Sequence, residues 1–138
     1  MPIHSGHLRF STDGDGDVID LTEGVASVVR SAGVEQGMAS VFAPGSTAAV
    51  TLMEYEPGGV HDLGATLDRM IPRAGDYEHN RLNHDTNSHA HIRAAIVGAS
   101  ETVPVRDGRL ATGTWQQIVL VDFDDRPRER TVVVQVVS

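Results

Sequence analysis

The chain has 138 residues, a formal net charge of −8 and no cysteine. This length is typical of one domain that is large enough to bury a hydrophobic core. The negative charge argues against non-specific binding to nucleic acid or to an anionic membrane. Because cysteine is absent, disulfides and thiolate metal sites are excluded, and a metal would have to be bound by His, Asp or Glu.

No apolar stretch of the sequence approaches the length of a membrane span. The N-terminus, MPIHSGHLRF, has neither the charged start nor the apolar run of a signal peptide. We therefore expect a cytoplasmic protein made of a single domain over residues 1–138.

The first elements in chain order are two short strands, over residues 8–11 and 17–21. Between them the segment DGDGD, residues 13–17, predicts a hairpin turn because Gly and Asp alternate. The same segment resembles the start of a calcium-binding loop. Val18 stands where that loop needs its invariant Gly, and Gly24 stands where it needs a bidentate Glu, so the turn is favoured.

A helix is expected to begin at an N-cap, Thr22, and to end near Ser31, with Gly33 placed to stop it. Strands over residues 37–42 and 48–53 follow, joined by a turn of small residues at 44–47. A second helix is expected from Gly59 or Val60 to Ile71, where Pro72 ends it.

Residues 73–88 form a long polar segment without a regular pattern, which is more often functional than idle. From His89 the sequence alternates again and predicts a strand in which His89, His91 and Arg93 share one side. Ile92 would then face the core from the opposite side.

Three further strands are expected over residues 102–105, 115–123 and 131–137, with turns at 107–108 and 124–127. Strands 118–123 and 132–137 carry valine on both faces, which suggests more sheet surface than two helices can cover. The short connections imply mostly antiparallel pairing. The predicted fold class is α+β, with two helices packed on a mostly antiparallel sheet.

Four of the seven histidines lie between His79 and His91, in HNRLNHDTNSHAH, which also contains Asp85 and Asn87. Even spacing would place about 0.7 histidines in a window of thirteen residues. Imidazole and carboxylate are the ligands of zinc and related metals, and histidine also carries protons. The cluster predicts a functional site, with a polar loop as the plain alternative.

Three other features are candidates for the same site. Glu54, at a strand end, is either a base or ligand or an ordinary solvated acid. Asp62 is expected in the first turn of the second helix. There its negative charge would stabilise the helix dipole, and this structural role would explain the residue without a catalytic function. The segment Gly45-Ser46-Thr47 is either a phosphate cradle or a plain turn, and Arg93 beside the histidines would favour anion binding.

Established catalytic signatures are absent from the sequence. A His-x-His pair begins the cupin metal motif, but Ala94, Ala95 and Ile96 stand where a cupin needs a Glu. There is no GxSxG elbow, no HExxH and no dinucleotide-binding fingerprint.

Four segments of the sequence are more specific, because they point to a protein family. They are VFAPGSTAAVTLMEYEPG, YEHNRLNHDTNSHAHIRAAIVGAS, VPVRDGRLATGTWQQIVLVDFDDRPRER and VVVQV. Together they resemble the YjbQ-like family, whose members are often described as secondary thiamine-phosphate synthases. The resemblance covers nearly the whole chain. It implies a barrel-like β-sandwich, a homotrimer, and the joining of a pyrimidine diphosphate to a thiazole phosphate with release of pyrophosphate.

The resemblance also extends to single residues. The positions that match the family's pattern are Glu54, Asp62, His79, Asp85, Asn87, His91 and residues 113–116, GTWQ. His84 and His89 do not stand at its usual histidine positions. Many members carry a histidine where this chain has Gly45.

The leading hypothesis is an enzyme that acts on a phosphorylated small molecule with a divalent metal, zinc or magnesium. Its metal ligands would be His79, His91 and Asp85, and its catalytic groups Glu54, Asp62, His79 and Asp85. Its substrate-binding groups would be Ser46, Thr47, Asn87, Arg93 and Gln116. The alternatives are a metal-dependent hydrolase, with Glu54 or Asp62 activating water, and a non-enzymatic oligomer that binds a metal or metabolite.

Overall fold

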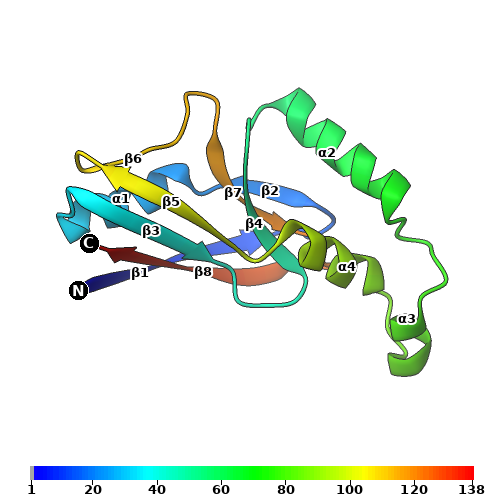
Figure 1. The fold of residues 1–138 in the computed structure, drawn as a ribbon. Coiled ribbons are helices and arrows are strands. Elements are labelled where there is room, and N and C mark those ends of the chain that lie inside the picture. Colours follow the sequence, from blue (N-terminus) through cyan, green and yellow to red (C-terminus); the bar gives the residue numbers. More distant parts are fainter. Residues whose placement is uncertain (1) are drawn as a thin grey trace.

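Two antiparallel sheets form the framework of the computed structural model, which describes residues 2–138 (Figure 1). The larger sheet has the order β1(Ile3–Thr12), β8(Arg128–Val137), β3(Gln36–Phe42), β5(Ser100–Arg106) and β6(Arg109–Leu110). The smaller sheet has the order β2(Asp17–Asp20), β7(Gln117–Asp122) and β4(Ala48–Met53). The helices are α1(Thr22–Ala32), α2(Pro57–Met70), α3(Glu78–Asn83) and α4(Ser88–Val97). The α+β class is confirmed, with four helices instead of two.

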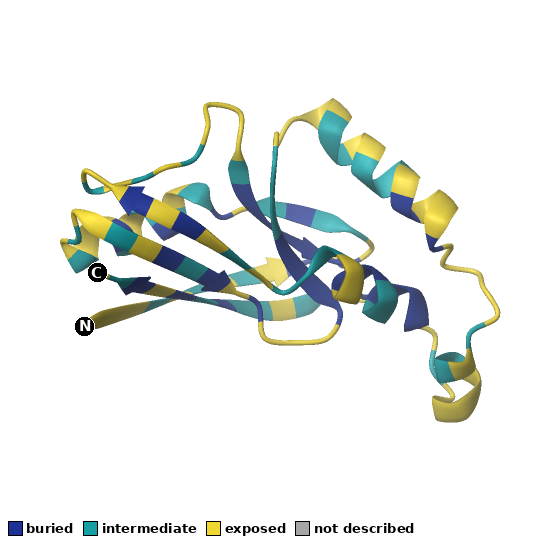
Figure 2. Ribbon diagram, viewed as in Figure 1, coloured by how far each residue is buried: buried dark blue, intermediate teal, exposed yellow. Residues whose placement is uncertain are grey.

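Strand β7 is buried on both faces, because the smaller sheet lies between two hydrophobic layers (Figure 2). Ile118 and Leu120 pack toward the larger sheet, in a core that also contains residues of α1, β3, β5 and β8. Val119 and Val121 pack in a second core against residues of α2 and α4. Both faces of β7 are therefore covered within one chain, one by the larger sheet and the other by α2 and α4.

The predicted strand from His89 is wrong, because residues 88–97 form helix α4. Ala90 and Ala94 lie one helical turn apart, are 0% and 6% exposed, and let α4 approach β4 closely. An alternation over so few residues is compatible with the period of a strand or with that of a helix, and tertiary packing decides in favour of the helix. Successive helical positions turn by about 100°, so His89 and His91 point in nearly opposite directions.

The predicted hairpin turn at residues 13–17 joins strands of different sheets. β1 pairs with β8, whereas β2 pairs with β7. Gly14, Asp15 and Gly16 all have positive φ angles, of 74°, 53° and 85°, so the chain does turn sharply here. The turns at 43–47 and 123–127 also cross between the sheets.

Several expected details of the elements differ. Thr22 is the first residue of α1, and its hydroxyl accepts a hydrogen bond from the Ile118 N–H at 2.9 Å instead of capping the helix. Helix α2 begins earlier than expected, because the Glu56 carboxylate accepts the N–H groups of its first turn. The irregular segment 73–88 contains α3. Trp115 lies outside β7 and is 71% exposed, although a strand was expected to begin there. No helix within residues 2–138 has the length and apolar character needed to cross a membrane.

The close approach of β3 to β8 predicts the effect of a single methyl group. A Cβ added at Gly37 would meet the carbonyl oxygen of Val137, so Gly37→Ala should lower the unfolding free energy by about 1–3 kcal/mol. As a control, Gly64→Ala in helix α2 meets no atom within 4 Å and should stabilise by about 0.5–1 kcal/mol. Urea unfolding of both variants tests this. A Gly37→Ala variant as stable as the original chain would contradict the described strand contact.

Candidate functional site

Helices α3 and α4 bring two of the clustered histidines together. The rings of His79 on α3 and His91 on α4 are 4.6 Å apart between centroids, with an interplanar angle of 65°. The Nε2 atom of His79 lies 3.3 Å from the Asn87 amide oxygen and 3.7 Å from the Asp85 carboxylate. The structure therefore gathers four residues that the sequence proposed: His79, Asp85, Asn87 and His91.

The Ser46 backbone carbonyl lies 3.1 Å from Nδ1 of His91. Since a carbonyl only accepts hydrogen bonds, Nδ1 must carry a proton to bond with it. In the neutral ring this leaves the lone pair on Nε2. His91 is thus set up to offer Nε2 as a base or as a metal ligand.

The segment between α3 and α4 is fixed by side-chain hydrogen bonds. His84 ends α3 in the left-handed conformation, with φ 52°. The Asn80 side chain accepts the Ser88 N–H at 3.0 Å, and the Thr86 hydroxyl donates to Asp125 in the turn after β7. These contacts hold Asp85 and Asn87 beside His79.

A pocket of about 380 Å³ opens beside His91, between the turn after β3 and helix α4. It is lined by Gly45, Ser46 and Ala48 from the turn and β4, and by His91 and Ala94 from the helix. The floor is made of small residues, so a ligand would be recognised by the backbone of the turn and by the imidazole.

Two buried ion pairs lie next to this turn. Arg130 donates from Nε and Nη2 to the Asp122 carboxylate at 2.7 and 2.8 Å, and Arg128 donates to Asp124 at 2.7 Å. Both carboxylates are 0% exposed. Nη2 of Arg130 also donates to the Thr47 hydroxyl at 2.7 Å, which connects the pairs to the turn.

These contacts set the acidity of the two carboxyl groups. Burial by itself would raise the pKa of Asp124, but hydrogen bonds from Arg128 and from the Asp125 N–H outweigh it and lower the pKa to about 2. Burial likewise opposes ionisation of Asp122, and hydrogen bonds from Arg130 and Thr12 hold its pKa below the ordinary value. Both groups are therefore carboxylates at neutral pH.

Arg93 lies elsewhere, because α4 is a helix. It is 6% exposed and donates to the Ile71 carbonyl, from Nε at 3.2 Å and from Nη2 at 2.8 Å. Its Nη2 also donates to Asp68 at 3.0 Å. Arg93 thus ties α4 to the end of α2, and the expectation that it shares a face with His91 is wrong.

Three other proposed residues neither line the pocket beside His91, as Ser46 does, nor belong to the cluster of His79, Asp85, Asn87 and His91. Glu54 is exposed after β4. Asp62 is exposed on α2 beyond the first turn, where it lies 3.3 Å from Nδ1 of His61. The Gln116 amide oxygen accepts the Gly113 N–H at 2.8 Å within the loop before β7.

His89 is buried, with 2% of its surface exposed, and does not contribute to the pocket. Burial and the nearby Arg93 lower its pKa, so it is neutral in the folded chain. Within residues 2–138 its Nδ1 is the buried side-chain polar atom that has no hydrogen-bond partner.

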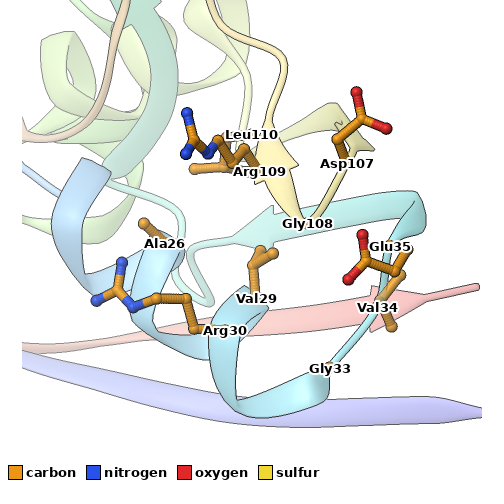
Figure 3. A pocket seen from close by; sticks show the side chains of 10 residues that line it. All are labelled: Ala26, Val29, Arg30, Gly33, Val34, Glu35, Asp107, Gly108, Arg109 and Leu110. Atoms are coloured by element: carbon orange, nitrogen blue, oxygen red, sulfur yellow. The ribbon is translucent and has the colours of Figure 1, made fainter.

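A larger pocket, of about 490 Å³, lies away from the histidines, between α1 and the β5–β6 hairpin (Figure 3). Arg30 and Arg109 stand at one side of it, and Glu35 and Asp107 at the other. The sequence singled out none of these side chains.

Residues 6–138 match the family described as "UPF0047 protein YjbQ-like". A UPF0047 protein of Methanothermobacter thermautotrophicus is 35% identical over 136 residues, which cover 99% of this chain and 93% of that protein. One of Archaeoglobus fulgidus is 37% identical, covering 93% of this chain and 97% of that protein. The chain belongs to the YjbQ-like UPF0047 family.

Solved structures of YjbQ-like proteins have the same fold. A protein of Sulfolobus solfataricus, described as YbjQ-like and of unknown function, has a TM-score of 0.93 at 32% identity, covering 98% of this chain and 96% of that one. A hypothetical protein of Aeropyrum pernix has a TM-score of 0.90 at 34% identity, covering 97% and 98%. The names of these relatives state no activity, so the function has to be inferred from the site.

The sequence of this YjbQ-like chain did not point to Asp122, Asp124 and Arg130. One feature could have indicated the two buried acids, because Asp122 ends an apolar run typical of a central strand and Asp124 follows it closely. Carboxylates at such positions are almost never buried unless they are paired. The segment DFDDRPRER reads equally well as a polar turn, however, and only the tertiary structure shows it buried.

The lowered pKa values predict a loss of stability in acid. A carboxylate whose folded pKa is depressed contributes stability above its unfolded pKa, near 3.8, and loses it as the pH falls toward the folded value. Unfolding free energy should therefore fall between about pH 4 and pH 2. Asp124→Asn should flatten that part of the curve relative to the unchanged chain, as measured by denaturant unfolding at each pH. An equally steep curve in the variant would contradict the role given to Asp124.

Proposed function

We propose that this protein binds a phosphorylated small molecule in the pocket beside His91 and acts on it with a divalent metal. The observation that carries the proposal is that His91 lines a pocket beside the turn at 43–47 and has the ring of His79 packed against its own. A turn of small residues suits a phosphate ester because its backbone N–H groups can donate to phosphate oxygens, and a metal held by the imidazoles would neutralise the phosphate charge.

The donor set for the metal consists of His79, His91 and Asp85. Two imidazole nitrogens and one carboxylate oxygen are ligands that zinc accepts, and magnesium would rely more on the carboxylate and on the substrate's phosphates. Within residues 2–138 no group of three such side chains already converges on one point. We infer that the ligands close around the metal by side-chain rotation. His91 would bind through the free Nε2, and His79 would bind through Nε2 once the proton that faces the Asn87 and Asp85 oxygens has been released or moved to Nδ1.

For the reaction we propose chemistry like that of a thiamine-phosphate synthase, in which a pyrimidine diphosphate is joined to a thiazole phosphate and pyrophosphate leaves. The leaving group needs a metal or cationic clamp and no covalent nucleophile. Ser46 lines the pocket and Asn87 lies beside His79, so we propose that both bind substrate, whereas the Thr47 hydroxyl is buried against Arg130. Metal-assisted hydrolysis by Glu54 or Asp62 receives less support, because neither residue lines the pocket or belongs to the cluster of His79, Asp85, Asn87 and His91.

The first test is metal and pyrophosphate binding by histidine variants. His79→Ala and His91→Ala should each weaken zinc binding, and pyrophosphate binding in its presence, at least tenfold in calorimetry. His61→Ala removes an exposed histidine of α2 and should change neither affinity. Binding should weaken as the pH falls, because protonated imidazoles do not bind metal. If the unchanged chain binds neither zinc nor pyrophosphate, the proposal fails. Binding without turnover of the two phosphorylated substrates would favour the non-enzymatic alternative.

We also propose that the chain forms a homotrimer through the outer face of the larger sheet. Three large apolar side chains are exposed on that face, Ile3 at 59%, Met38 at 52% and Phe42 at 45%. Met38 stands opposite both Pro104 and Val137, and Val137 stands opposite Ile3, so one apolar row crosses four strands. A continuous apolar row on a sheet face suits burial against another copy of the chain, and a heterologous contact of this kind, repeated three times, closes a trimeric ring.

Light scattering should give three times the chain mass of 14.8 kDa at micromolar concentration. Met38→Glu places a charge in the apolar row and should shift the protein toward monomer. Met70→Glu is the matched control, because Met70 is 68% exposed on α2, outside the sheet. A monomeric mass for the unchanged chain, or equal dissociation of both variants, would count against this interface.

A further inference from the structure

We propose that Arg130 binds the phosphate group of the ligand through Nη1, and that Gly45 keeps the path to this nitrogen open. This inference rests on the proposed function and identifies a phosphate subsite within it. The sequence pointed instead to Arg93, which the structure places at the end of α2.

Arg130 is held rigidly in one position. Its Nε and Nη2 atoms bond both oxygens of the buried Asp122 carboxylate, and Nη2 also reaches Thr47. The Thr12 hydroxyl fixes the same carboxylate from β1, at 2.5 Å. The side chain is 11% exposed. A guanidinium fixed in this way loses little entropy when it binds a further acceptor.

The third nitrogen of the group is directed at the turn after β3. A Cβ built on Gly45 would lie 2.9 Å from Nη1 of Arg130. Among the residues that the structure describes, 2–138, Nη1 has no hydrogen-bond partner. Gly45 has φ 126° and lines the pocket beside His91, whereas Arg130 does not line it. We infer that a ligand in the pocket reaches Nη1 through the space that a side chain at Gly45 would fill.

The geometry fits a tetrahedral anion better than a neutral ligand. An N–H of a guanidinium makes a charge-assisted hydrogen bond to a phosphate oxygen, and His91 borders the same pocket. Asp122 neutralises most of the charge of Arg130, so the subsite supplies a directed donor and little net positive charge. A phosphate or pyrophosphate bound here would still require a metal, which matches the role proposed for the histidines.

The subsite can be tested without removing Arg130, whose loss would leave a buried carboxylate unpaired. Gly45→Ala adds a methyl group against Nη1, and Gly33→Ala is the control. Gly33 also has a positive φ, of 65°, but an added Cβ meets no atom within 4 Å and the residue lies outside this pocket. The probe is inorganic pyrophosphate titrated by calorimetry in the presence of zinc, with zinc alone titrated in parallel.

We expect Gly45→Ala to bind pyrophosphate at least tenfold more weakly, with unchanged zinc affinity, and Gly33→Ala to bind both within twofold of the unchanged chain. The side-chain Nε–H signal of Arg130 in ¹⁵N NMR should shift on addition of pyrophosphate to the unchanged chain. Full pyrophosphate binding by Gly45→Ala, or an Arg130 signal that does not move, would overturn the subsite and leave the proposed function standing. No pyrophosphate binding by the unchanged chain would overturn both.

Discussion

The buried ion pair between Asp122 and Arg130 is the contact on which the rest of the structure depends. It lies where the three sheet-crossing turns meet, because Asp122 ends β7, Thr12 ends β1 and Thr47 precedes β4. Burying two charges is costly, and the cost is offset only when their remaining hydrogen-bonding groups are satisfied. Here Thr12 and the Asp124 N–H satisfy the carboxylate, and Thr47 accepts from Nη2 of Arg130; within residues 2–138 Nη1 is the nitrogen of this guanidinium that has no partner. Removing one partner of such a pair typically costs about 3–5 kcal/mol.

The same network determines where the candidate site is. Thr47 is buried at 5% exposure and bonds to Asp124 and Arg130, so the turn that carries Ser46 is fixed on its inner side. On its outer side the Ser46 carbonyl is bonded to His91. A pocket whose wall is fixed from both sides needs little reordering when a ligand binds, which favours affinity.

The histidine helices are attached to this framework at few points. Ala90 and Ala94 pack α4 on β4, Arg93 bonds it to α2, and Thr86 bonds the preceding loop to Asp125. Helix α3 has no buried residue and extends beyond the sheets at one end of the molecule (Figure 1). His79 therefore sits on the less constrained side of the site and His91 on the more constrained one. Such an arrangement suits a site that closes around a metal and substrate.

The sequence alone determined the fold class, most of the strands, the histidine cluster and the turn at residues 44–47. These features are local, since they follow from side-chain periodicity, turn residues and composition over short windows. The tertiary structure decided that residues 88–97 are a helix. In so short a segment the residue pattern fits the period of a strand as well as that of a helix, and only packing against β4 distinguishes them. It also decided that Arg130 and not Arg93 reaches the turn that borders the pocket. Arg130 reaches the turn 83 residues away in sequence, and no local pattern encodes which distant groups an arginine will meet across two sheets.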